Sequence, residues 1–220
     1  MAPSATTTEP IPLPPSKQLI PKSKDDPTKE KTALQAISQG VCLPGIPLFS
    51  SYDKHRAWIL SHMAGAFRVF ARKGFTEAGK AWSAFGRPLE MINQDVTYFY
   101  GDAQAVYEDF GGVVLSEAEG KKLAAALGPK GKGLILQNHG LLTVGGTVDE
   151  AAYLYTLMEK SCEVQLKVEA AAANGLPKKI VDDEAAAYTF KMASDPEALY
   201  WEFQPDLEYE YEMSGGIFEK

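Results

Sequence analysis

The segment at residues 133–146, GLILQNHGLLTVGG, places one histidine, His139, in a tight turn between two apolar runs. Apolar runs of this length, flanked by glycine, are typical of buried strands. A turn held by two strands can present an imidazole rigidly, either as a metal ligand or as a general base. The alternative is a histidine that simply hydrogen-bonds the turn. His139 is therefore the candidate site residue, and its chemistry depends on which side chains accompany it.

The chain offers few companions for this imidazole, because its only other histidines are His55 and His62. They are seven residues apart on a predicted helix, which separates them by about 10 Å along its axis. A helical zinc pair prefers a spacing of four, so both are expected to be surface or boundary residues. Cys162 falls on the apolar stripe of another predicted helix and is expected in the core. An open catalytic zinc site needs about three protein ligands, and only His139 is positioned to serve.

Other catalytic and nucleotide-binding motifs do not emerge from the sequence. The glycine pairs at 111–112 and 145–146 lack the spacing of a phosphate-binding loop or a dinucleotide fingerprint and are interpreted as turns. Asp95, Glu108 and Asp109 are carboxylates near predicted strand ends, but their spacing marks none of them as an acid or base. No catalytic residue is assigned, and no nucleotide cofactor is expected.

Several periodic segments must position this turn. A helix is predicted from Ser51 or Asp53 to Gly74, and the residues of its expected core face are Ile59, Met63, Ala66, Phe67 and Phe70. A short helix is predicted at 80–85, and strands at 89–92, 96–100 and 113–115. Capping boxes at 116–119 and 147–150 open two helices, of which the second runs to about residue 173. Further helices are predicted at 182–191 and from residue 196.

The alternation of strands and helices after residue 89 predicts a layered α/β domain. The two runs that flank His139 are too close in sequence for a crossover connection, so they should pair antiparallel. The expected fold class is therefore α/β, a three-layer α/β/α domain with a mixed, partly antiparallel sheet. We divide the chain into a Pro- and Lys-rich disordered leader at 1–35, a domain at 36–195 and an acidic aromatic arm at 196–220.

Composition excludes several classes of function. The net charge of −7 and the pI of about 5.1 argue against nucleic-acid binding, which calls for a basic stripe. No apolar run is long enough to span a membrane, and the N-terminus does not have the pattern of a secretory signal. The two cysteines lie far apart without a disulfide framework, which favours a reducing compartment. The expected location is the cytoplasm.

Three segments resemble the class II aldolase/adducin family: LILQNHGLLTVGGTVDEAAYLYTLMEKSCEVQLKVEAA, RAWILSHMAGAFRVFARKGF and GKAWSAFGRPLEMINQDVTYFYGD. The resemblance covers about residues 48–195. It implies that His139 matches the third imidazole ligand of a divalent ion, usually zinc. It also implies a homo-oligomer, and a reaction on small hydroxy-carbonyl, sugar-phosphate-like substrates. In the adducin branch the fold is kept without the metal chemistry, and it associates with the actin cytoskeleton.

The chain departs from the family pattern at one place, near residues 78–79. Family members have several dozen residues here, including a His-x-His pair of metal ligands, an acidic catalytic residue and strands of the central sheet. This sequence contains no His-x-His, so the domain is expected to be incomplete and impaired in catalysis. Three hypotheses remain open: an impaired zinc-dependent enzyme, a non-catalytic adducin-like module, and a truncated form that arises from splicing or from a faulty gene model.

Overall fold

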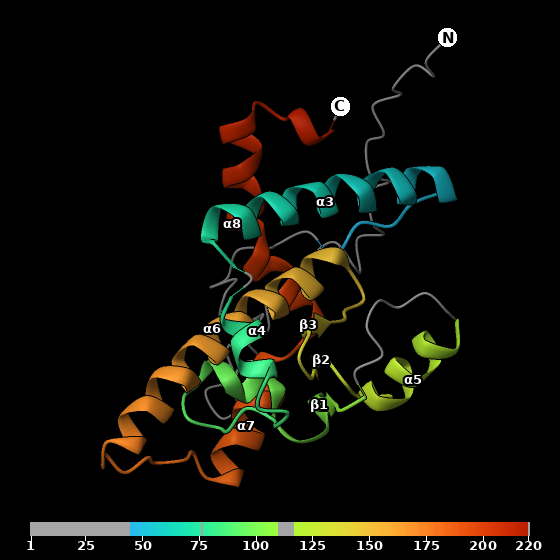
Figure 1. Cartoon of the computed structure of the whole chain (residues 1–220). Coiled ribbons are helices and arrows are strands. Elements are labelled where there is room, and N and C mark those ends of the chain that lie inside the picture. The colour runs from blue at the N-terminus through green and yellow to red at the C-terminus, as the bar shows by residue number, and fades with distance from the viewer. Residues whose placement is uncertain (1–44, 76, 110–116, 220) are drawn as a thin grey trace, which may run out of the picture.

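The computed structural model describes residues 45–75, 77–109 and 117–219 (Figure 1). The predicted leader at 1–35 and the predicted strand at 113–115 lie outside these ranges. The helices are α3 (Tyr52–Lys73), α4 (Ala78–Ser83), α5 (Glu117–Leu127), α6 (Val148–Ala173), α7 (Asp183–Ala193) and α8 (Pro196–Ser214). Short 3₁₀ helices are η1 (Asp95–Phe99), η2 (Gly101–Ala103) and η3 (Ile217–Glu219), and the strands are β1 (Gln104–Tyr107), β2 (Gly133–Leu136) and β3 (Gly140–Thr143).

The described strands form one sheet in the order β1-β2-β3. β1 pairs with β2 in parallel, and β2 pairs with β3 antiparallel through the turn that carries His139. The α/β class and the mixed, partly antiparallel sheet are thus confirmed. β1 was not predicted, because Gln104 and Ala105 interrupt any apolar run that would mark it.

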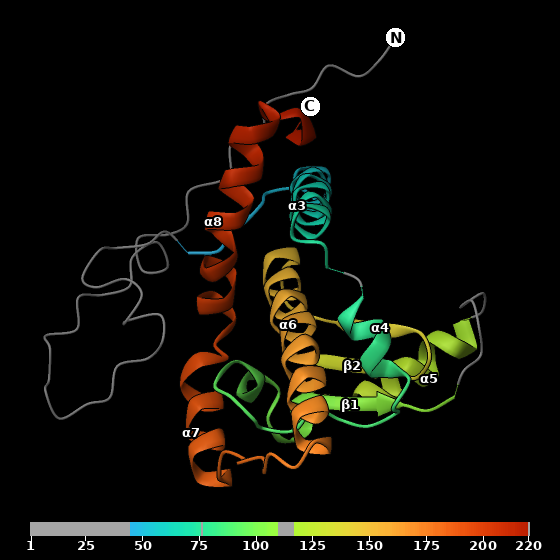
Figure 2. The same cartoon turned by 60° about the vertical axis from the view of Figure 1, so that its left-hand side comes forward.

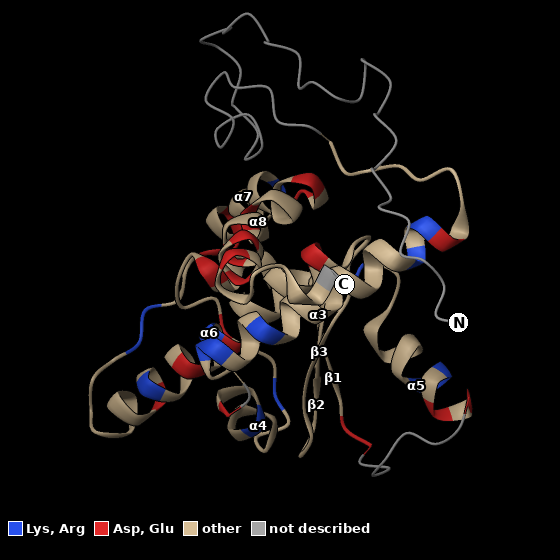
Figure 3. Cartoon of the chain, turned by 90° about the horizontal axis from the view of Figure 1, so that it is seen from above, with Lys and Arg blue, Asp and Glu red and all other residues tan. Residues whose placement is uncertain are grey.

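Helices cover both faces of this small sheet. Figure 3, seen from above, shows α4 and α6 on one side of the strands and α5 on the other. Helices α3 and α8 pack against one end of α6 and against each other, so they extend the molecule beyond the sheet (Figure 2). No helix in the described ranges is both long and apolar enough to cross a membrane.

Two apolar clusters hold these layers together. The larger joins α4, η1, β2, α6 and α8 through fully buried side chains such as Trp82, Phe99, Ile135 and Met158. The smaller joins α3, α6 and α8 around Val69 and Phe203. Cys162 belongs to the larger cluster, as predicted, and burial raises the pKa of its thiol above the usual range.

Most predicted helices begin and end where their caps indicate. The Ser51 side chain accepts a hydrogen bond from Lys54 N, and Gly74 ends α3 in the left-handed region at φ 66°. Thr147 caps α6 by accepting from Glu150 N. The carboxylate of Glu150 accepts instead from Gly146 N and pairs with Lys132, so this capping box is shifted by one residue.

The predictions of strands at 89–92 and 96–100 are wrong. Residues 89–92 form no strand, because other partners replace a strand ladder. Gln104 bonds both backbone groups of Leu89, and Gln165 accepts from Glu90 N. The Met91 carbonyl accepts a single backbone bond, from Val181 N. Residues 95–99 form the 3₁₀ helix η1. Asn93 caps it by accepting from Val96 N, which favours a tight turn over an extended chain.

The predicted core face of α3 is only partly buried. Ala66 is buried together with Gly65 and Val69, but Phe67 is 66% exposed and Met63 is 39% exposed. The predicted helix is confirmed, yet its apolar stripe is wider than the surface that packs on it.

Candidate functional site

The hairpin β2–β3 presents His139 on a fixed turn. His139 N donates to the carbonyl of Leu136 at 2.9 Å, and Asn138 N donates to the carbonyl of Ser83 in α4 at 3.2 Å. Asn138 has φ 57°, a left-handed conformation that asparagine tolerates better than most residues. The turn is therefore held from two sides, while the His139 side chain is exposed and has no hydrogen-bond partner within the described ranges.

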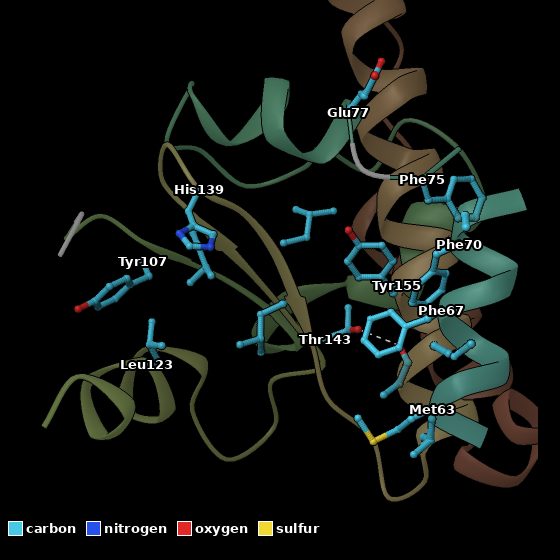
Figure 4. A pocket seen from close by; sticks show the side chains of 18 of the residues that line it. Met63, Phe67, Phe70, Phe75, Glu77, Tyr107, Leu123, His139, Thr143 and Tyr155 are labelled. Atoms are coloured by element: carbon cyan, nitrogen blue, oxygen red, sulfur yellow. Dashed lines mark hydrogen bonds between the residues drawn. The ribbon is translucent and has the colours of Figure 1, made fainter. Parts of the chain in front are cut away.

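His139 lies at the edge of a cavity of about 1010 Å³. Figure 4 shows His139 and Tyr107 on one side of this cavity and Met63, Phe67 and Phe70 of α3 on the other. Tyr155 of α6 lies between them, and Leu141, Leu142 and Thr143 of β3 also line it. The cavity explains the exposed aromatic stripe of α3, because no described element fills the space between α3 and β3.

The other histidines lie away from His139 and do not line this cavity. His55 and His62 flank Trp58 on α3, with ring centroids 6.2 and 4.4 Å from the indole. His62 is also engaged with Asp149, which is fully buried, at 2.7 and 2.9 Å. Gln204 of α8 donates to the same carboxylate at 2.9 Å. This cluster joins three helices and has a structural role.

Carboxylates near the cavity do not complete a metal site. Glu77, Asp109 and Glu119 line it, but within the described ranges no three His, Cys, Asp or Glu side chains gather closely enough to hold an ion. Tyr107 donates to Glu119 at 2.6 Å, and this bond raises the pKa of Tyr107 to about 12. One exposed imidazole with dispersed carboxylates does not fit the ligand set that zinc requires.

A buried carboxylate fixes the start of α4, next to residues 78–79, where a segment is predicted to be missing. Glu159 of α6 accepts from Ala78 N at 2.9 Å and from Gly79 N at 3.0 Å. A Cβ at Gly79 would lie 2.5 Å from both Glu159 Oε2 and Leu141 Cδ1, so only glycine fits. Neither Glu159 nor Asp149 was selected from the sequence, because nothing in their spacing distinguishes them from solvent-facing acids of a long helix.

Comparison with known proteins identifies the family. The family model described as "Class II Aldolase and Adducin N-terminal domain" matches residues 75–166. The Meiotically up-regulated gene 14 protein of Schizosaccharomyces pombe is 30% identical over an alignment that covers 80% of this chain and 97% of that protein. This chain belongs to the class II aldolase and adducin family. Catalytic members of the family generally depend on zinc.

Other proteins are similar to part of the sequence or to the fold of the chain. It is 43% identical over 105 residues to Decarboxylase NovR of Streptomyces niveus, covering 48% of this chain and 37% of that one. It is 35% identical over 119 residues to alpha-adducin of Rattus norvegicus, covering 54% and 16%. The chain thus spans well under half of either relative. The structure of L-fuculose 1-phosphate aldolase from Glaciozyma antarctica PI12 matches with a TM-score of 0.67 and 25% identity, covering 80% of this chain and 97% of that one.

Proposed function

We propose that this chain is a non-catalytic member of the class II aldolase/adducin family, in which His139 is the remnant of a zinc site. The observation that carries the proposal is the isolation of His139. It is exposed at the edge of a largely apolar cavity, while the chain's other two histidines lie away from it on α3. A single imidazole binds zinc too weakly to supply the Lewis acid that stabilises an enediolate.

The alignment with the fission-yeast relative supports a missing internal segment as the cause. It runs over 253 positions, which exceeds the 220 residues of this chain, so it includes positions for which the chain has no residue. We infer that such positions fall near residues 78–79, where the sequence departs from the family pattern. Whether this reflects a natural paralogue or a splice form is decided by sequencing the native transcript across the junction.

Zinc titration calorimetry tests the loss of catalysis. We expect no stoichiometric binding, and we expect the wild-type chain and the His139→Ala variant to give the same titration curve. Aldol cleavage of L-fuculose 1-phosphate should not exceed the rate without protein. Stoichiometric zinc binding that is lost in the His139→Ala variant, or cleavage that depends on His139, would contradict the proposal. Either result would favour an active enzyme that acts on a small carbonyl substrate.

A second candidate function is association with the actin cytoskeleton in the cytoplasm, as in the adducin branch. The similarity to alpha-adducin over 119 residues favours it. Co-sedimentation with filamentous actin tests it directly: pelleting that saturates would support the adducin-like function, and recovery of all the protein in the supernatant would remove it. Sedimentation of the chain alone tests the homo-oligomer that the resemblance implies.

A further inference from the structure

The outer edge of β3 is open along the cavity. Val144 N donates to the carbonyl of Lys132 at 3.0 Å, and the register pairs Leu142 with Leu134 and Gly140 with Leu136. Antiparallel bonding alternates along a strand, so residues 140, 142 and 144 bond towards β2. The backbone groups of Leu141 and Thr143 therefore point to the opposite edge, where no described strand or helix offers them a backbone partner.

The part of the cavity between β3 and α3, called the groove below, is lined mainly by apolar side chains. Phe67 and Phe70 of α3 face β3 across it, and Tyr155 of α6 lies between them (Figure 4). Phe67 is 66% exposed although it belongs to a helix that packs firmly elsewhere. An exposed row of strand donors and acceptors next to unpacked aromatic side chains is a surface that another strand can cover.

The charges around the groove restrict what fits there. Among the described lining residues Glu77, Asp109 and Glu119 are acidic, and none is lysine or arginine. Three lysines lie nearby. The side-chain stem of Lys80 lies near Gly140, and the ammonium groups of Lys73 and Lys160 lie over the ring of Phe75. The last two are already paired with carboxylates outside the cavity, Asp206 and Glu163. The excess of negative charge favours a basic occupant over an acidic one.

We propose that the β3 edge and this cavity bind an extended segment of a partner protein as an added strand, apolar at alternate positions and basic at its ends. Backbone groups of the segment pair with Leu141 and Thr143, and its apolar side chains pack against Phe67 and Phe70. The inference rests on the proposed function in one respect: it takes binding of a partner, and not metal chemistry, as the function of the chain.

Fluorescence anisotropy with a short labelled peptide of alternating valine and threonine, with lysine at both ends, tests the proposal on the full chain. We expect saturable binding. A control peptide with proline at the central valine should bind about tenfold more weakly, because proline removes a ladder donor. Equal binding of both peptides, or binding of neither, would overturn the proposal.

Two matched pairs of variants locate the binding site. Thr143→Val removes the hydroxyl that donates to the Ala151 carbonyl but keeps the outward N–H, whereas Thr143→Pro removes both. Only the proline should weaken binding, by about tenfold. Ala71→Trp fills the groove from α3 and should weaken binding similarly, while Ala57→Trp, exposed on the same helix away from the groove, should not. Circular dichroism confirms that each variant folds.

Two results would contradict the proposed site, the first by giving the groove a different occupant and the second by placing the peptide elsewhere. A dimer of the chain that Thr143→Pro dissociates would mean that a second copy covers the β3 edge. Unchanged peptide affinity after both Thr143→Pro and Ala71→Trp would mean that the peptide binds elsewhere. Zinc content measured on the same preparation separates this proposal from the proposed function: a zinc-free chain that binds no peptide overturns only the strand site.

Discussion

The helical end of the molecule and its hairpin end differ in how completely their polar groups are paired. Where α3, α6 and α8 meet, the buried carboxylates of Asp149 and Glu210 are matched, the first by His62 and Gln204 and the second by Arg68 and Arg72. At the hairpin, the outward backbone groups of β3 and the His139 imidazole face a cavity. The open polar groups therefore lie at the hairpin end, while the buried carboxylates where α3, α6 and α8 meet are paired.

Two methionines, one from each environment, should give the largest contrast in stability. Met158 is fully buried in the main cluster, whereas Met63 is 39% exposed at the cavity. We predict that Met158→Ala lowers the free energy of unfolding by about 3 kcal/mol, through lost burial and the cavity left behind. Met63→Ala should cost under about 1 kcal/mol. Urea denaturation of the two variants measures the difference, and similar losses would show that the region beside β3 is packed as tightly as the core.

The Asp149 cluster should rank second. Asp149→Ala removes the hydrogen-bond partner of His62 and one of the two acceptors of the Gln204 amide. We expect this to lower the free energy of unfolding by about 2 kcal/mol. Glu163 is a matched control, because it forms ion pairs with Lys160 and Lys167 on the exposed side of the same helix. Glu163→Ala should cost less than about 0.5 kcal/mol. An equal cost in the two variants would contradict the structural role of Asp149.

The smallest effect is expected at the hairpin end, in the titration of Tyr107. Its hydrogen bond to Glu119 raises its pKa from 10.0 to about 12. The folded state therefore keeps the phenol proton where the unfolded state has lost it. The contribution of this bond to stability is complete below about pH 10 and is lost as pH rises towards 12.

Ultraviolet difference spectroscopy of the Glu119→Ala variant checks this titration. One tyrosine should ionise at lower pH than in the wild-type chain, while Lys121→Ala, on the same helix, should leave the profile unchanged. A Tyr107 titration that does not respond to Glu119→Ala would show that the hydrogen bond does not control it.

The sequence predicted the helical end better than the hairpin end. The caps at Ser51, Gly74 and Thr147 are local signals, and each acts where expected. The strand predicted at 89–92 does not form, because Gln104 and Gln165 bond its backbone from distant positions in the sequence. The turn around His139 was recognised from its own residues, but the cavity beside it was not, because an empty space leaves no pattern in the helix that faces it.

Hydrogen exchange measured by NMR on the full chain tests the central claim, that the sheet is open at β3, most directly. The Leu142 amide bonds towards β2, whereas the Leu141 and Thr143 amides point to the open edge. We predict that Leu142 is protected and that Thr143 exchanges at least about 100-fold faster, because an unpaired amide needs no opening of the ladder. Protection of Thr143 equal to that of Leu142 would contradict the account, since it would show that the edge is already covered.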